Sequence, residues 1–167
     1  SATLLKDELT KKHKHEPTNY LLAMAPFNTS DTSLIPDLFI DRSIKRDEVT
    51  PLKYSGQEVA NITKLMNGTS YYGKDATEPK FVEIAPNYRI IHLATHSQIN
   101  NKSSNYSFLA FSEIKDSIEN EFLYARELYN LSLNADMVVL SACETGIGEI
   151  YQGEGIISLA RAFTYSG

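Results

Sequence analysis

The sequence predicts an α/β fold with a central, mostly parallel sheet and helices on both of its faces. Residues 88–94 and residues 137–141 each form a nearly continuous apolar run. Such runs are typical of strands that are buried on both faces, as in parallel sheets covered by helices. These and other strand-like runs alternate along the chain with segments whose apolar residues recur at helical spacing. This alternation favours an open α/β sheet.

The first half of the chain supplies elements of both kinds. Residues 2–15 carry three leucines at helical spacing and lysines near their end, which predicts a short surface helix. Residues 20–25 are a compact apolar run stopped by a proline, which predicts a buried strand. Residues 28–50 are rich in Asn, Ser, Thr, Asp and Pro and predict a long loop.

A helix is predicted over residues 57–66, because its apolar side chains share one face and an Asn-Gly pair follows it. These side chains are Val59, Ile62, Leu65 and Met66. Residues 71–72 predict a short strand, and residues 75–84 an amphipathic helix whose start or a break is set by Pro79.

The second half of the chain continues the alternation. The strand at 88–94 is followed by a polar insert and by an alternating apolar segment over residues 106–111. Residues 121–130 predict a helix, and the strand at 137–141 follows. Residues 155–164 predict a helix with Ile156, Leu159, Ala160 and Phe163 facing inward.

Composition excludes several classes of protein. The chain has 167 residues, 42% of them apolar, which suits one soluble domain with a real core. A net charge of −5 gives no electrostatic reason to expect nucleic acid or an anionic membrane as a partner. No apolar run is long enough to span a bilayer, and there is no signal-peptide pattern. A single cysteine fits a reducing compartment, so we expect a cytoplasmic protein.

The two strands named first each end in a reactive side chain, His96 in one and Cys143 in the other. Ligands of open α/β sheets bind beyond the carboxyl ends of the strands, so we expect both side chains at the same edge. An imidazole can take the proton of a thiol and later protonate a leaving amine. The glycines in the turn after Cys143 would allow backbone N–H groups to approach an oxyanion.

Plainer interpretations compete with this one. A lone cysteine at a strand end is often a small buried hydrophobe, and we interpret His92 as a structural residue. No metal site is expected, because Leu93 stands where a zinc-binding H-E-x-x-H motif has Glu. Glu149 stands where a cysteine phosphatase needs Arg, and the glycines of a nucleophile elbow are missing around Cys143.

Four motifs together resemble the CHAT domain, a caspase-like family related to caspases and separases and often attached to TPR repeats in bacteria. They are HLATH at 92–96, LSACETG at 140–146, GEG at 153–155 and LARAF at 159–163. The resemblance implies a caspase-like α/β/α sandwich and a single CHAT-type domain over residues 1–167 that is truncated at both ends.

The resemblance also implies a cysteine endopeptidase without a cofactor. It makes Cys143 the nucleophile and His96 the catalytic histidine, with the backbone N–H groups of Ser97 and Cys143 as oxyanion donors. The family commonly has Gly where Ser97 stands. Glu144 and Gly146 are candidate substrate-binding residues.

Three functions remain open at this stage. The first is hydrolysis of polypeptides, with TPR repeats or other domains as partners. The second is a catalytically silent scaffold or signalling module, against which an intact Cys-His pair argues. The third, a small-molecule hydrolase, rests on analogy of fold alone.

Overall fold

The computed structural model describes residues 16–28, 51–100, 103–112, 122–141 and 154–167. Within these residues, four parallel strands form the main sheet in the order β2-β1-β3-β7. Their bounds are β1 Asn19–Ala25, β2 Thr69–Tyr72, β3 Tyr88–Leu93 and β7 Met137–Leu140. The predicted α/β fold with a mostly parallel sheet is confirmed.

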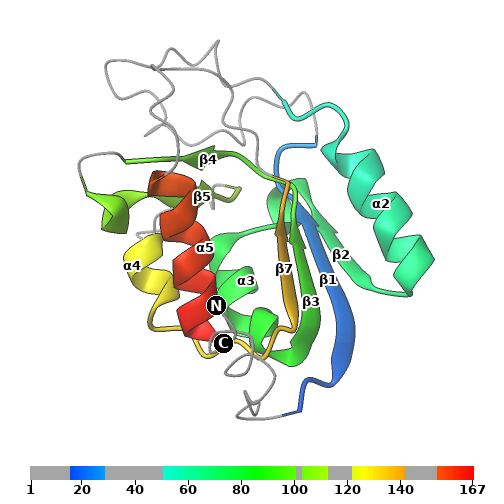
Figure 1. Cartoon of the computed structure of the whole chain (residues 1–167). Coiled ribbons are helices and arrows are strands. Elements are labelled where there is room, and N and C mark those ends of the chain that lie inside the picture. Colours follow the sequence, from blue (N-terminus) through cyan, green and yellow to red (C-terminus); the bar gives the residue numbers. More distant parts are fainter. Residues whose placement is uncertain (1–15, 29–50, 101–102, 113–121, 142–153) are drawn as a thin grey trace.

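Helices lie on both faces of this sheet (Figure 1). On one face, α2 (Ser55–Met66) packs through Val59 on the small side chains of β1. On the other face lie α3 (Glu78–Ile84), α4 (Ala125–Leu128) and α5 (Glu154–Ser166). These three helices contribute Phe81, Leu128 and Leu159 to the main core. Alternate residues of β1 pack against the helices on the two faces, because successive side chains of a strand point to opposite sides.

Local chemistry explains where the first helices begin and end. Asn67 closes α2 in the left-handed conformation, with φ 50° and ψ 48°, which Asn tolerates better than most residues. Helix α3 starts after Thr77, whose hydroxyl accepts a hydrogen bond from the Lys80 N–H. Its Pro79 lies in the first turn, where a missing N–H costs nothing. Short 3₁₀ turns lie at Gly73–Asp75, before α3, at Ala85–Asn87, directly after it, and at Ser104–Tyr106.

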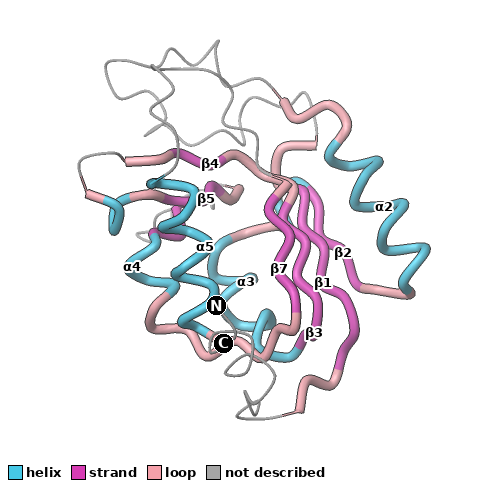
Figure 2. Tube along the Cα trace, viewed as in Figure 1, coloured by secondary structure: helices cyan, strands magenta, loops and turns pink. Residues whose placement is uncertain are grey.

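A second, antiparallel sheet adjoins the carboxyl ends of the main strands (Figure 2). It contains β4 (Ser97–Gln98), β5 (Phe108–Ala110) and β6 (Phe122–Tyr124), in that order. The helix predicted over 121–130 is therefore wrong in its first part, since residues 122–124 are a strand and the helix covers only Ala125–Leu128. Aromatic pairing decides this: the rings of Phe108 and Phe122 lie 4.4 Å apart across the two strands.

Two apolar side chains differ from their prediction, Leu65 in the apolar face predicted for residues 57–66 and Ala160 in the inward face predicted for residues 155–164. Leu65 is 85% exposed at the end of α2, and Ala160 is exposed on α5. On α5, Ala162 is buried instead, beside Leu159 and Phe163. The helix predicted over residues 2–15 lies outside the described residues, as does most of the loop predicted over 28–50.

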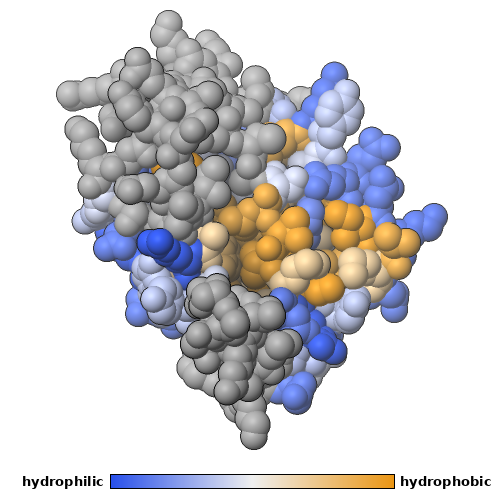
Figure 3. Space-filling model, viewed as in Figure 1, coloured by the Kyte–Doolittle hydropathy of each residue, from blue (hydrophilic) through white to orange (hydrophobic). Residues whose placement is uncertain are grey.

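Among the described strands, β7 forms one edge of the main sheet. Its first residue, Met137, is 48% exposed, and Figure 3 shows hydrophobic residues gathered across this part of the surface. No helix in the described part of the chain is long and apolar enough to cross a membrane.

Candidate active site

The order of the strands defines one switch point in the main sheet. From β1, the chain runs through α2 to β2 on one side, then through α3 to β3 on the other side. The order therefore reverses between β1 and β3. In open α/β sheets, ligands bind beyond the carboxyl ends of the strands at such a switch point. Residues that directly follow β1 and β3 are the ones to examine.

His96 lies at this point, three residues after the end of β3. The backbone on its N-terminal side still belongs to the main sheet, because the Ala94 N–H donates to Met24 O at 2.9 Å. The backbone of His96 belongs to the second sheet, because the Ala110 N–H donates to its carbonyl at 2.9 Å. His96 thus occupies the junction of the two sheets and is 4% exposed.

Thr95 also connects the two sheets at this junction, through its side chain. It is fully buried, and its hydroxyl donates to Ala110 O at 2.5 Å. The carbonyl and the N–H of Ala110 thus bond to Thr95 and to His96, respectively. The chain therefore enters the second sheet at one defined angle, which sets the position of the His96 Cα atom.

Ser97, the first residue of β4, is half-buried and pairs with Leu109 of β5. The bond from Ala110 N–H to His96 O shows the phase of this ladder. In an antiparallel ladder, hydrogen-bonded and non-hydrogen-bonded pairs alternate, and here Ser97 and Leu109 form a non-hydrogen-bonded pair. The Ser97 N–H consequently points away from β5, toward the edge of β4 that pairs with no other described strand.

Cys143, Glu144 and Gly146 lie outside the described residues. Ser141 is the last described residue before this segment, and its N–H donates to Leu93 O at 2.9 Å. Strand β7 is paired with β3 as far as Leu93 and Leu140. The chain thus runs toward Cys143 directly beside the strand that leads to His96.

Phe27 is a residue of this site that the sequence did not single out. It follows Pro26, which ends β1, and its ring centroid lies 5.1 Å from that of His96, at an interplanar angle of 47°. Phe27 is 2% exposed and packs with Ala110 and Phe122 of the second sheet. The ends of β1 and β3 therefore meet through these two rings. Its only sequence signal was its place directly after the Pro that ends an apolar run.

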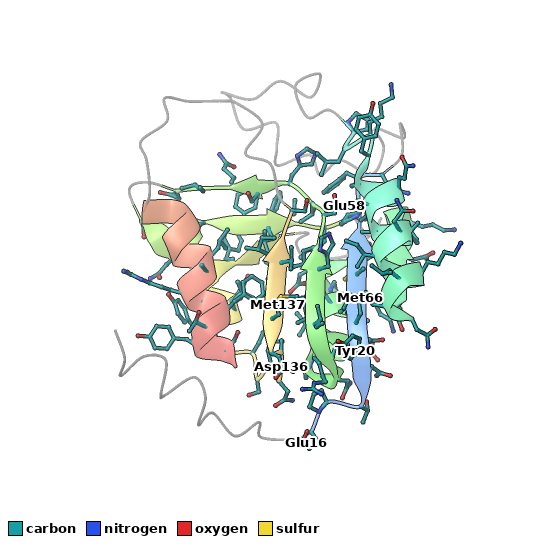
Figure 4. The ribbon with its side chains drawn as sticks, turned by 45° about the vertical axis from the view of Figure 1, so that its right-hand side comes forward. Glu16, Tyr20, Glu58, Met66, Asp136 and Met137 are labelled. Carbon is teal, nitrogen blue, oxygen red and sulfur yellow. The ribbon has the colours of Figure 1, made fainter. Side chains whose placement is uncertain are left out.

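His92 has a different environment, under helix α2. It is 5% exposed, and its Nε2 lies 3.0 Å from Glu58 Oε1, without the alignment of a hydrogen bond. Figure 4 labels Glu58 on the side of α2 that faces the sheet. His92 joins α2 to β3, in keeping with its interpretation as structural. Among the described residues, no three His, Cys, Asp or Glu side chains are grouped as for a metal ion.

Charged pairs with shifted pKa values lie away from this edge. A hydrogen bond to Asp136, with its charge, raises the pKa of Arg89 at the start of β3. A hydrogen bond to Glu83, with its charge, raises the pKa of Lys80 on α3. A cavity of about 950 Å³ between β7 and α5 is lined by residues such as Leu133, Met137 and Phe163, and by none of the predicted site residues.

The parallel α/β sheet, covered by helices and carrying a buried histidine at its switch point, is the architecture of a caspase-like domain. The family model of the CHAT domain matches residues 2–167. The chain therefore belongs to the CHAT family, which is caspase-like and related to peptidases. A comparison with curated proteins found no match.

Proposed function

We propose that the chain is the cysteine endopeptidase domain of a larger protein, with Cys143 as nucleophile and His96 as its base. One observation carries the proposal. Leu93 pairs with Leu140 in adjacent parallel strands, His96 follows Leu93 by three residues, and Cys143 follows Leu140 by three residues. Adjacent strands lie about 4.8 Å apart, so we expect His96 and Cys143 at the same edge of the sheet.

The proposed reaction proceeds through an acyl-enzyme. His96 takes the thiol proton, and the thiolate of Cys143 attacks the carbonyl carbon of the scissile peptide bond. The backbone N–H groups of Ser97 and Cys143 hold the resulting oxyanion. His96 then protonates the leaving amine, and the C–N bond breaks to leave a thioester. Water, deprotonated by His96, hydrolyses the thioester and regenerates the thiol.

Two features of the described residues support these roles. The register of β4 and β5 leaves the Ser97 N–H outside the ladder and thus available to a substrate oxygen. The edge of β4 that no described strand pairs with could also bind an extended polypeptide, which would give affinity through main-chain hydrogen bonds. Glu144 and Gly146 would contact the substrate from the turn after the nucleophile.

The setting of this activity is also part of the proposal. The substrate would be a polypeptide, and TPR repeats or other domains of a longer chain would present it. We propose a cytoplasmic enzyme that needs no cofactor and has no nucleic-acid or membrane partner.

Alkylation of Cys143 by iodoacetamide tests the proposal directly. An activated thiolate reacts faster at neutral pH than an ordinary thiol, whose pKa is about 8.5. Cys143 should therefore react faster than glutathione, and His96→Ala should slow it. Cleavage of a peptide library by the full-length protein should disappear in Cys143→Ala. A rate equal to that of glutathione, unchanged by His96→Ala, would favour the silent scaffold instead.

A further inference from the structure

Phe27 is the one described aromatic residue whose ring contacts the His96 imidazole, at 5.1 Å between centroids and 47° between planes. Both side chains are nearly fully buried, at 2% and 4% exposure. They come from opposite sides of the switch point, Phe27 from the end of β1 and His96 from the end of β3. The contact therefore lies at the centre of the edge where the proposed chemistry occurs.

Phe27 is itself held firmly on its backbone and on its ring. The Leu52 N–H, just before α2, donates to Phe27 O at 2.8 Å. The preceding carbonyl, Pro26 O, lies 3.2 Å from the hydroxyl of buried Ser112. The side chains of Ala110 and Phe122 in the second sheet pack against the Phe27 ring. Three separate segments thus fix the position of Phe27.

The Phe27 ring can restrict a rotation of the His96 imidazole that the backbone bond leaves open. Its backbone is fixed by the bond to Ala110 N–H, but this does not fix the rotation of its ring. Rotation of an imidazole about its last torsion is soft, with a broad and roughly two-fold profile. A rigid aromatic ring against the imidazole restricts this rotation by shape, whereas a flexible aliphatic side chain would yield.

We propose that Phe27 is a positioning residue that fixes the orientation of the His96 ring for proton exchange with Cys143. The role of Phe27 in catalysis rests on the proposed function. A misplacement of about 1 Å in a catalytic group can cost roughly 100-fold in rate, so the ring contact matters even though Phe27 touches no substrate. The competing explanation is that Phe27 only fills the core, and the test must separate the two.

The test measures the rate of Cys143 alkylation by iodoacetamide between pH 6 and 9 in the full chain. The variants are Phe27→Leu, His96→Ala and the combination of both. Phe27→Leu should slow alkylation at neutral pH by about tenfold or more, in line with the cost of misplacing a catalytic group. In the His96→Ala background it should cause no further loss, because the effect of Phe27 passes through His96.

Phe81→Leu is the matched control. Phe81 is fully buried, and its ring lies 5.4 Å from that of Phe111, but it belongs to α3 and the main core. Phe81→Leu should lower Tm as Phe27→Leu does, yet leave alkylation unchanged. Phe27→Tyr keeps the ring and should retain most of the rate. If Phe27→Leu does not fold, Phe27→Met replaces it, since Met fills the volume without a planar ring.

Two results would overturn the proposal. One is alkylation of Phe27→Leu at the wild-type rate while His96→Ala slows it. The other is an equal loss from Phe27→Leu in both backgrounds. If His96→Ala does not change the rate of Cys143 alkylation, the proposed function fails. NMR then tests separately whether Phe27 fixes the orientation of the His96 ring. The imidazole signals of His96 should then change on Phe27→Leu and not on Phe81→Leu; unchanged signals would contradict the positioning role.

Discussion

The two sheets of this domain are held together in different ways. The parallel sheet has β1 and β3 as its central strands, whose larger side chains, such as Leu22, Met24 and Ile91, are fully buried in one core. The antiparallel sheet has strands of two or three residues that are joined to each other by aromatic contacts and that reach the same core through Leu109 and Leu123. His96 lies at the junction of the two sheets. The first sheet supplies the longer buried strands, and the second holds the backbone of His96 through the Ala110 N–H.

The largest effect is expected in the parallel sheet. Leu93 is fully buried in the main core, so Leu93→Ala should lower the free energy of unfolding by about 2–5 kcal/mol. Urea denaturation followed by circular dichroism measures this change. Leu65→Ala is the control, because Leu65 is 85% exposed and should change stability by at most about 0.5 kcal/mol. Equal losses in the two variants would contradict the assigned core.

The next effect concerns catalysis at the edge of the second sheet. Ser97→Pro removes the backbone N–H that faces away from β5 and should lower kcat for peptide cleavage by about 10²–10³-fold. Alkylation of Cys143, which forms no oxyanion, should change little. Gln98→Pro is the control, because it removes a donor on the side of the ladder and should loosen the sheet instead. Wild-type turnover in Ser97→Pro would exclude this N–H as an oxyanion donor.

A smaller effect is expected at the junction itself. Thr95→Val removes the buried hydroxyl that donates to Ala110 O and should cost about 1–3 kcal/mol of stability. It should also slow alkylation of Cys143, since Ala110 holds the backbone of His96. Thr164→Val removes a comparable bond to Ala160 O on the exposed side of α5 and should change neither quantity. A Thr95→Val variant that matches Thr164→Val in both measurements would show that this bond does not hold the junction.

The smallest effect is expected at the opposite end of β3. Arg89 and Asp136 form an exposed ion pair of 2.7 Å, and such pairs contribute little. Arg89→Ala should lower Tm less than Thr95→Val does, and the difference should shrink in 1 M NaCl because salt screens surface charges. Thermal unfolding at two salt concentrations measures this. A large loss that persists in high salt would mean that the pair is more than a surface contact.

The sequence predicted the parallel sheet well, because long apolar runs such as 88–94 carry their own signal of burial. It predicted the second sheet poorly. Strands of two or three residues are too short for a reliable alternation, so the helix predicted over 121–130 includes residues 122–124, which form β6. Their strand conformation depends on cross-strand aromatic partners that are distant in sequence.

The candidate site divides in the same way. His96 could be found from the sequence because it ends an apolar run and belongs to a family motif. Phe27 could not, because its role depends on β1 and β3 being neighbours at a reversal of strand order. The orientation of the Ser97 N–H likewise depends on a ladder phase that only the pairing with Leu109 defines.

The distance between Cys143 Sγ and the His96 imidazole in an experimental structure of the full-length protein tests the central claim most directly. The shared register of β3 and β7 predicts both side chains at one edge of the sheet, facing a common cleft. We expect a separation within about 7 Å, since catalytic contacts are often loose without substrate. Side chains on opposite edges of the sheet, or separated by the width of another strand, would contradict the peptidase mechanism.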